Sequence, residues 1–306
     1  MTASDEHAEL FTRLRPLLFT IAYEVLGSAT ESDDVLQDSY LRWAEVGLAT
    51  VRDTKAYLAQ LVTRQALNAR RAGARRRESY VGPWPPGPIL VTEHDGAADA
   101  VLAESVSMGM LVVLETLTPN ERAVFVLREV FGFDHEDIAP AVGTSVTAVR
   151  QMAHRAREHV QARRKRLGPV DTAMTAAITE QFLAAAATGD MAGLLSLLAP
   201  DITWTTDSGG KVRAVRHLVM SDATQVASAF LALFREMRRR PGLRIEVVTY
   251  NSQPTMAIHL GELGESVCLL EISNGKITRG YSVRNPEKLA ALAVRRTITR
   301  GDTPAA

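Results

Sequence analysis

The segment "DHEDIAPAVGTSVTAVRQMAHRAREHVQARRKR", residues 134–166, constrains the fold most, because two helical patterns meet at a glycine. The short first pattern ends at Gly143, and the longer second one begins after Ser145, a residue type that caps helix N-termini. One face of the longer pattern is apolar. Its members are Val149, Ala153, Ala156 and Val160. Such a face packs on another helix, so the segment predicts a helix-turn-helix unit.

The opposite face of the same helix carries hydrogen-bond donors. Its members are Thr147, Arg150, Gln151, His154 and Arg155. Between residues 146 and 166 the only acid is Glu158. An ordinary solvated helix face mixes charges of both signs, and that is the alternative interpretation. We predict instead that this face binds base edges and phosphates in the major groove of DNA.

A second basic stretch lies near residue 70, at the end of a helical pattern over 53–77. Between Arg64 and Arg77 it holds six arginines and no acid. The residues concerned are Arg64, Asn68, Arg70, Arg71, Arg75, Arg76 and Arg77. Two separate basic surfaces suggest two contacts on one nucleic acid. The alternative, a basic tail that binds any polyanion, stays open on this stretch alone.

The third feature has the opposite charge. In "ESDDVLQDSYLRW", residues 31–43, Asp34 and Asp38 lie one helical turn apart, with Trp43 expected to be exposed beside them and a helix cap near Ser32. An acidic face repels DNA and therefore suits a protein partner. A solvated helix face is the alternative.

Composition limits the remaining possibilities. Thirty-five basic and thirty-five acidic residues give no net charge, so only their distribution informs on partners. The single cysteine, Cys268, excludes an internal disulfide and a cysteine-rich zinc site, and it fits a reducing compartment. The acidic N-terminus is no signal peptide, and no apolar run reaches the ~20 residues that span a bilayer. We expect a cytoplasmic protein with no metal, no cofactor and no membrane contact.

The order of patterns predicts a multidomain protein. Helices fill residues 1–78 and 106–167, and a stiff linker rich in proline and glycine joins them over 79–105. Beyond Gly168 two helices lead into alternating segments over 171–296, which indicates an α+β domain, and 297–306 forms a tail.

The acidic "DDVLQDSYLRW", the basic "AYLAQLVTRQALNARR" and the helix-turn-helix, taken in this order, resemble the extracytoplasmic-function (ECF) sigma factors of bacterial RNA polymerase over residues 8–167. The resemblance implies two all-α sigma domains and a non-enzymatic factor that takes core polymerase to promoters, on the nucleoid when bound. It assigns the first acidic helix to the β′ clamp helices and the second domain to the β flap. The β′-docking residues would be Asp34, Gln37, Asp38, Leu41 and Arg42.

The same resemblance assigns the DNA contacts. Arg64, Asn68, Arg70, Arg71, Arg75 and Arg76 match the segment that reads and melts the −10 element. Thr147, Arg150, Gln151, His154 and Arg155 match the helix that reads the −35 element. Most relatives carry Asp where this chain has Asn68, which affects the promoter preference.

The remaining residues resemble a SnoaL-like (NTF2-like) cone domain found on one subgroup of the family. The shared motifs are "YVGPWPPGP" at 80–88, "DSGGK" at 207–211 and "NPEKL" at 285–289, each with departures. This resemblance implies regulation in cis, and our hypothesis is that the second and third motifs contact the linker or the basic helices. The interdomain residues would be Trp84, Asp207, Gly209, Gly210, Lys211, Asn285, Pro286 and Lys288.

Two alternatives stay open for this domain. "DSGGK" also suits a plain turn between strands. The chain could also be a DNA-tethered sensor of an unknown small ligand, or an enzyme. The acid–base candidates are Asp207, His217, His259, Glu271 and Tyr281.

Overall fold

The computed structural model describes residues 3–74, 85–91, 100–164, 172–209, 219–239, 242–260 and 265–301. The N-terminal helical domain consists of α1 (Ala3–Leu26), α2 (Ala29–Trp43), a short 3-10 turn (Leu48–Thr50) and α3 (Thr54–Ala72). Helix α1 ends at Gly27, whose φ of 73° is left-handed and whose added side chain would meet Glu115 at 3.1 Å. Glycine at this position therefore ends the helix and allows the second helical domain to approach.

Two expectations for α2 are wrong. Its N-cap is Ser28, whose side chain accepts a bond from the Glu31 amide, while Ser32 is buried. Trp43 is fully buried, and its Nε1 donates to the carbonyl of His7 at 3.0 Å. The beginning of α1 supplies this cover, because it extends to Ala3 and reaches the far end of α2.

The second helical domain contains the predicted helix-turn-helix. It consists of α6 (Ala100–Ser105), α7 (Met108–Leu114), α8 (Pro119–Phe125) running into a π-helical turn (Val126–Val130), α9 (His135–Val142) and α10 (Val146–Arg164). A capping box between Thr118 and Glu121 begins α8. Helix α9 ends at Gly143, whose φ is 71°. The helix-turn-helix prediction is confirmed.

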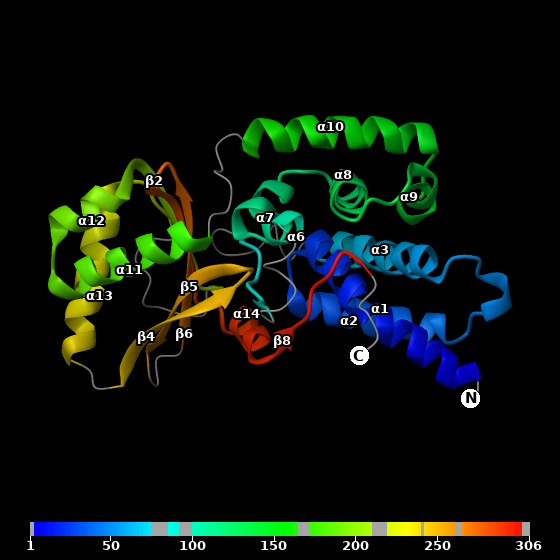
Figure 1. Cartoon of the computed structure of the whole chain (residues 1–306), viewed down its shortest axis with the longest axis horizontal. Coiled ribbons are helices and arrows are strands. Elements are labelled where there is room, and N and C mark those ends of the chain that lie inside the picture. The colour runs from blue at the N-terminus through cyan, green and yellow to red at the C-terminus, as the bar shows by residue number, and fades with distance from the viewer. Residues whose placement is uncertain are drawn as a thin grey trace.

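The C-terminal domain is α+β, as predicted. Its helices are α11 (Thr172–Thr188), α12 (Met191–Leu197), α13 (Ala223–Arg239) and α14 (Pro286–Ala290), the last followed by a 3-10 turn (Ala291–Ala293). Its strands are β2 (Leu198–Asp207), β3 (Val219–Met220), β4 (Leu243–Tyr250), β5 (Gln253–Leu260), β6 (Glu265–Ser273), β7 (Lys276–Val283) and β8 (Arg295–Arg296). Helices α11 to α13 cover one face of the curved sheet around Phe182, Trp204 and Phe230 (Figure 1).

The linker is part of that sheet. Its strand β1 (Leu90–Val91) pairs with β4 on one side and, in parallel, with β8 on the other. The sheet order is β3-β2-β7-β6-β5-β4-β1-β8. The segment between the helical domains is therefore held by the C-terminal domain rather than spanning free space.

One hydrophobic core joins the two helical domains. Leu18 of α1, Leu58 of α3, Val124 of α8 and Ile138 of α9 all belong to it. A smaller core around Met108, Leu269 and Tyr281 joins α7 to the other face of the C-terminal sheet. The three domains thus form one closed body (Figure 1). Within the described residues, no helix is long and apolar enough to cross a membrane.

Candidate nucleic-acid and polymerase interfaces

The acidic surface of α2 faces solvent in the closed body. Asp34, Gln37, Asp38, Leu41 and Arg42 are all exposed, while Val35, Leu36, Ser39 and Trp43 form the buried side of the helix. Leu41 is 59% exposed, which is unusual for a leucine and places an apolar group among the carboxylates. The predicted docking residues are thus all accessible to a protein partner in this arrangement.

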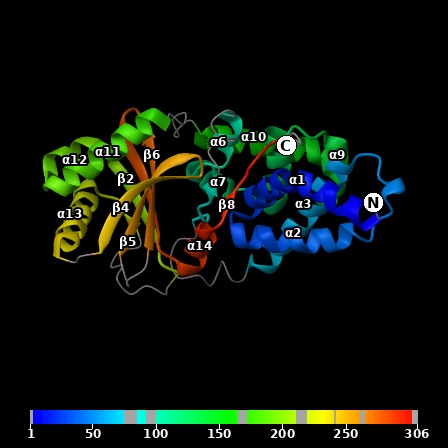
Figure 2. The same ribbon diagram turned by 60° about the horizontal axis from the view of Figure 1, so that its bottom comes forward.

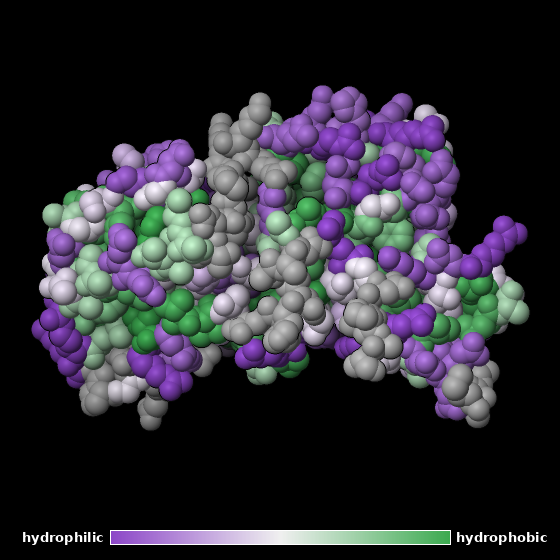
Figure 3. Space-filling view, viewed as in Figure 1, coloured by the Kyte–Doolittle hydropathy of each residue, from purple (hydrophilic) through white to green (hydrophobic). Residues whose placement is uncertain are grey.

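The donor-rich side of α10 is also open. Thr147, Arg150, Gln151, His154 and Arg155 are exposed, and Figure 3 shows a hydrophilic surface over this helix. Arg150 contacts Glu136 at 3.1 Å, and Arg155 contacts Glu121 at 3.4 Å. Exposed pairs of this kind contribute little stability, so phosphates could replace the carboxylates at small cost.

The basic side of α3 is different, because it touches the second helical domain. Arg64 is exposed but donates to the carbonyl of Pro140 at 3.0 Å, and Arg71 donates to Asn120 at 3.1 Å. Asn68 is exposed one turn from each of them. Arg75 and Arg76 lie outside the described residues. The residues predicted to meet the −10 element thus lie beside α8 and α9.

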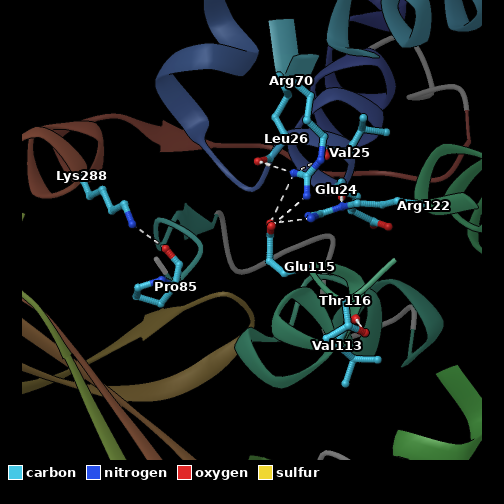
Figure 4. Close-up of polar contacts among 10 residues, drawn as sticks. All are labelled: Glu24, Val25, Leu26, Arg70, Pro85, Val113, Glu115, Thr116, Arg122 and Lys288. Carbon is cyan, nitrogen blue, oxygen red and sulfur yellow. Dashed lines mark hydrogen bonds and ion pairs between the residues drawn. The ribbon is translucent and has the colours of Figure 1, made fainter. Parts of the chain in front are cut away.

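Arg70, which we expected to face a nucleic acid, is buried in this structure. Its guanidinium reaches the Glu115 carboxylate at 2.8 Å and the carbonyl of Val25 at 3.2 Å (Figure 4). Arg122, fully buried, contacts the same carboxylate at 2.5 Å and donates to the carbonyl of Glu24 at 2.6 Å. In this arrangement the Glu115 carboxylate bonds the guanidinium groups of both Arg70 and Arg122.

The two guanidinium groups control the charge of Glu115. Burial alone would raise the pKa of this carboxyl, but Arg122 and Arg70 outweigh it and lower the pKa to about 2. Glu115 is therefore ionised throughout the physiological pH range. The cluster crosses the boundary between the helical domains and fixes their orientation by directional, charge-assisted bonds.

A second cluster, which sequence reasoning missed, centres on Asn251 in the turn between β4 and β5. Its Nδ2 donates to the Tyr23 hydroxyl at 2.7 Å and to the carbonyl of Val106 at 2.8 Å, while its Oδ1 accepts from the Ile89 amide at 2.9 Å. Tyr23 in turn donates to the carbonyl of Gly87 at 2.8 Å. One buried side chain thus joins both helical domains, the linker and the C-terminal domain.

The only local signal for this role was the "NS" pair in a tight turn. Asn251 and Ser252 both have positive φ, 51° and 58°. Asparagine tolerates this conformation, so the sequence shows why the turn forms. It does not show which distant groups the amide bonds.

Five of the predicted interdomain residues lie in the described part of the chain. Four of them lie close together: Asp207, Gly209, Asn285 and Lys288. Lys288 contacts Asp207 at 2.8 Å and donates to the linker carbonyl of Pro85 at 2.5 Å (Figure 4). Gly209 has a φ of 64°, and an added side chain there would meet Asn285 at 2.8 Å. Pro286 is exposed at the start of α14. Trp84, Gly210 and Lys211 lie outside the described residues.

The proposed acid–base candidates do not gather in one place. Tyr281 donates to Glu271 at 2.7 Å, whereas His259 contacts Glu246 at 2.5 Å and Asp207 is held by Lys288. His217 lies outside the described residues. No group of three or more histidine, cysteine, aspartate or glutamate side chains in the described part of the chain could hold a metal ion.

Comparison with known proteins defines the class. Residues 10–76 match the family model for sigma-70 region 2, and residues 108–160 match that for sigma-70 region 4. These spans coincide with the two helical domains. The chain belongs to the ECF RNA polymerase sigma factors.

Relatives along the whole length support this assignment. The chain is 33% identical over 298 residues to the ECF RNA polymerase sigma factor SigJ of Mycobacterium tuberculosis, covering 91% of each protein. It is 26% identical over 294 residues to a probable ECF sigma factor, SigI, of the same organism, covering 95% of this chain and 98% of that one. The crystal structure of M. tuberculosis SigJ matches with a TM-score of 0.73 at 28% identity, covering 95% of this chain and 99% of that one.

As a sigma factor, the protein binds RNA polymerase and promoter DNA through its two helical domains. Its C-terminal part adds an α+β domain.

Proposed function

We propose that this sigma factor is restrained in cis by its C-terminal domain, which holds the two promoter-reading domains in a closed, inactive arrangement. The burial of Arg70 carries the proposal, because a residue expected to contact the −10 element is bonded instead to Glu115 of the other helical domain. The shared core of the two helical domains supports the same interpretation.

The geometry of a promoter explains why this arrangement is inactive. The −10 and −35 elements are about 25 base pairs apart, which corresponds to ~85 Å of duplex at 3.4 Å per base pair. In the closed body α3 touches α9, as the bond from Arg64 to Pro140 shows. Both elements can be read together only after the two helical domains separate.

Separation requires release of the linker. The linker carbonyls of Pro85 and Gly87 accept bonds from Lys288 and Tyr23, and the Ile89 amide is held by Asn251. Strand β1 adds main-chain bonds to β4 and β8. The C-terminal domain thus acts on the distance between the promoter readers by binding the segment that joins them.

The residue assignments follow from this model. The exposed face of α2 would dock on the β′ clamp helices, and the second helical domain on the β flap. Arg64, Asn68, Arg71 and the arginines at 75 and 76 would contact the −10 element, joined by Arg70 in the open form. Thr147, Arg150, Gln151, His154 and Arg155 would read the −35 element.

The test is run-off transcription with core polymerase from the promoter of the protein's own locus. Asn251→Ala removes the side-chain bonds to Tyr23, Val106 and the Ile89 amide and keeps the main-chain bond to the Ile89 carbonyl. We expect it to increase promoter-specific transcripts over the unaltered chain. Ser252→Ala is the matched control, since the Ser252 hydroxyl has no hydrogen-bond partner in the described part of the chain.

A chain ending at Arg166 tests the same point by removing the whole C-terminal domain. An Asn251→Ala protein that is folded and binds core enzyme, yet transcribes no more than the control, would contradict restraint by this domain. Absence of transcripts and of core binding from every variant would contradict the assignments to polymerase and promoter.

A further inference from the structure

The last described part of the chain, residues 295–301, returns across both helical domains. We call it the strap. It leaves the C-terminal domain after α14, and two views show it crossing α1 on the way to the C-terminus (Figures 1 and 2). Its first two residues form β8, beside the linker strand β1. It is therefore the second segment, after the linker, that connects all parts of the closed body.

Three contacts fix the strap on the helical domains. Ile298 is fully buried in their shared core. The Thr299 amide donates to the Thr20 hydroxyl at 3.3 Å, and Arg300 donates to the carbonyl of Val130 at 3.2 Å, at the end of the π-helical turn. The strap thus bridges α1 in the first helical domain and the π-helical turn in the second.

Arg296 makes the most specific contact of the strap. Its guanidinium lies 2.8 Å from one oxygen of Asp33 and 2.9 Å from the other, and it stacks on the Phe19 ring at 4.6 Å. Arg296 is buried. We call Asp33 and the Phe19 ring together the arginine seat. A carboxylate beside an aromatic face selects the planar guanidinium over an ammonium group.

The arginine seat is continuous with the acidic surface of α2, the exposed face that carries Asp34 and Asp38. Asp33 lies on α2 one helical turn before Gln37, which belongs to that face. Both residues line a groove of about 430 Å³ between α1 and α2, together with Phe11, Arg15 and Tyr40. Arg15 contacts Asp33 at 3.6 Å from the groove side. The seat is thus one end of a surface whose remainder is open to solvent.

We propose that the arginine seat is part of the polymerase-docking surface, and that Arg296 occupies it in the closed chain. The partner is a basic segment of core polymerase that presents a guanidinium to Asp33 and Phe19. The strap and the polymerase then exclude one another on α2. This inference rests on the proposed function, because it names the step by which docking would release the restraint.

Population arithmetic sets the expected size of the effect. When only a small fraction of the chain is open, the apparent affinity for core enzyme is the intrinsic affinity reduced by that fraction. Loss of one buried guanidinium pair and one cation–π contact should shift the closed-to-open ratio about tenfold, or ~1.4 kcal/mol. Arg296→Ala should therefore tighten core binding about tenfold.

The experiment is titration of the full-length chain with core polymerase, in solution and at fixed salt. Arg296→Ala is compared with Arg295→Ala, its exposed neighbour on the same strand, which should bind like the unaltered chain. Arg296→Lys keeps the charge but loses the planar stack, and we expect it to fall between the two. Thermal unfolding of each variant reports whether it is folded.

A second pair of variants separates opening from direct contact. If Asp33 contacts polymerase, Asp33→Asn added to Arg296→Ala should weaken core binding several-fold relative to Arg296→Ala alone. A double variant that binds as tightly as Arg296→Ala would overturn the proposal, as would an Arg296→Ala chain with unchanged affinity. If Asn251→Ala still raises transcription in that case, the restraint in cis stands and only the inference about the seat fails.

Discussion

Helices α3 and α10 carry similar basic patterns, yet their arginines have different surroundings in the closed body. On α10, Arg150 and Arg155 are exposed, and Arg150 pairs with the equally exposed Glu136. On α3, Arg70 is buried against Glu115, and Arg64 touches Pro140. A charge pattern therefore identifies side chains suited to phosphate, but whether those side chains are exposed depends on segments distant in the sequence. The closed body covers part of the basic side of α3 and leaves the donor-rich side of α10 exposed.

The largest expected effect comes from removing the carboxylate that covers Arg70. Glu115→Gln leaves Arg70 and the fully buried Arg122 without a counter-charge, which should lower the free energy of unfolding by ~3–5 kcal/mol. Denaturant unfolding measures this loss. Because Arg70 then loses its carboxylate partner and keeps only carbonyl partners, binding of −10 single-stranded DNA by the holoenzyme should not decrease.

Glu136→Gln is the control, since it removes an exposed pair on α10 and should change stability by less than ~1 kcal/mol. Equal effects of the two substitutions would remove the distinction between the two basic helices.

Lowering the pH should reduce the stability as Glu115→Gln does. The pKa of Glu115 is depressed, so its contribution is present above its unfolded pKa and is lost as the pH falls toward about 2.

The next effect concerns Glu24, the neighbour of that cluster. Burial raises its pKa to about 8, partly offset by the Ser105 hydroxyl, Arg122 and Arg300. The folded state therefore binds a proton that the unfolded state has released, and stability should fall by up to ~1.4 kcal/mol per pH unit between about pH 5 and pH 8. Glu24→Gln should flatten this dependence in unfolding measured across that range.

Exposed Glu9, on the same helix, provides the comparison: Glu9→Gln should leave the slope unchanged. A slope that persists in Glu24→Gln would show that another group takes up the proton.

The smallest effect is expected on the open helix. Arg150→Ala should weaken binding of the holoenzyme to a −35 duplex by ~1–3 kcal/mol, because it removes one base-reading side chain without altering the closed body. Promoter binding at constant salt measures the change. Arg163→Ala, on the same helix beyond the predicted reading positions, should cost less and act equally on all sequences. A change in unfolding free energy as large as that of Glu115→Gln would contradict the idea that α10 is independent of the restraint.

The sequence predicted what depends on local periodicity. The helix-turn-helix, its turn at Gly143 and the exposure of Arg150 or Asp34 follow from spacing along a single helix. The motif resemblance named Asp207 and Lys288 as interdomain residues but did not predict that the two pair with one another. Burial of Arg70 and Trp43 was not predictable in this way, because their partners, Glu115 and His7, lie 45 and 36 residues away. Asn251 was missed for the same reason, since its partner Tyr23 lies 228 residues away.

The edge of the sheet has a consequence for timing. Among the described strands, β8 pairs only with β1. If β1 alone left the sheet, β8 would have no strand to hydrogen-bond. The two strands should therefore separate from β4 together, and partly opened forms of the linker should not accumulate. The chain should therefore switch between two states, closed and open, without populated intermediates. Its opening should follow a single exponential in time.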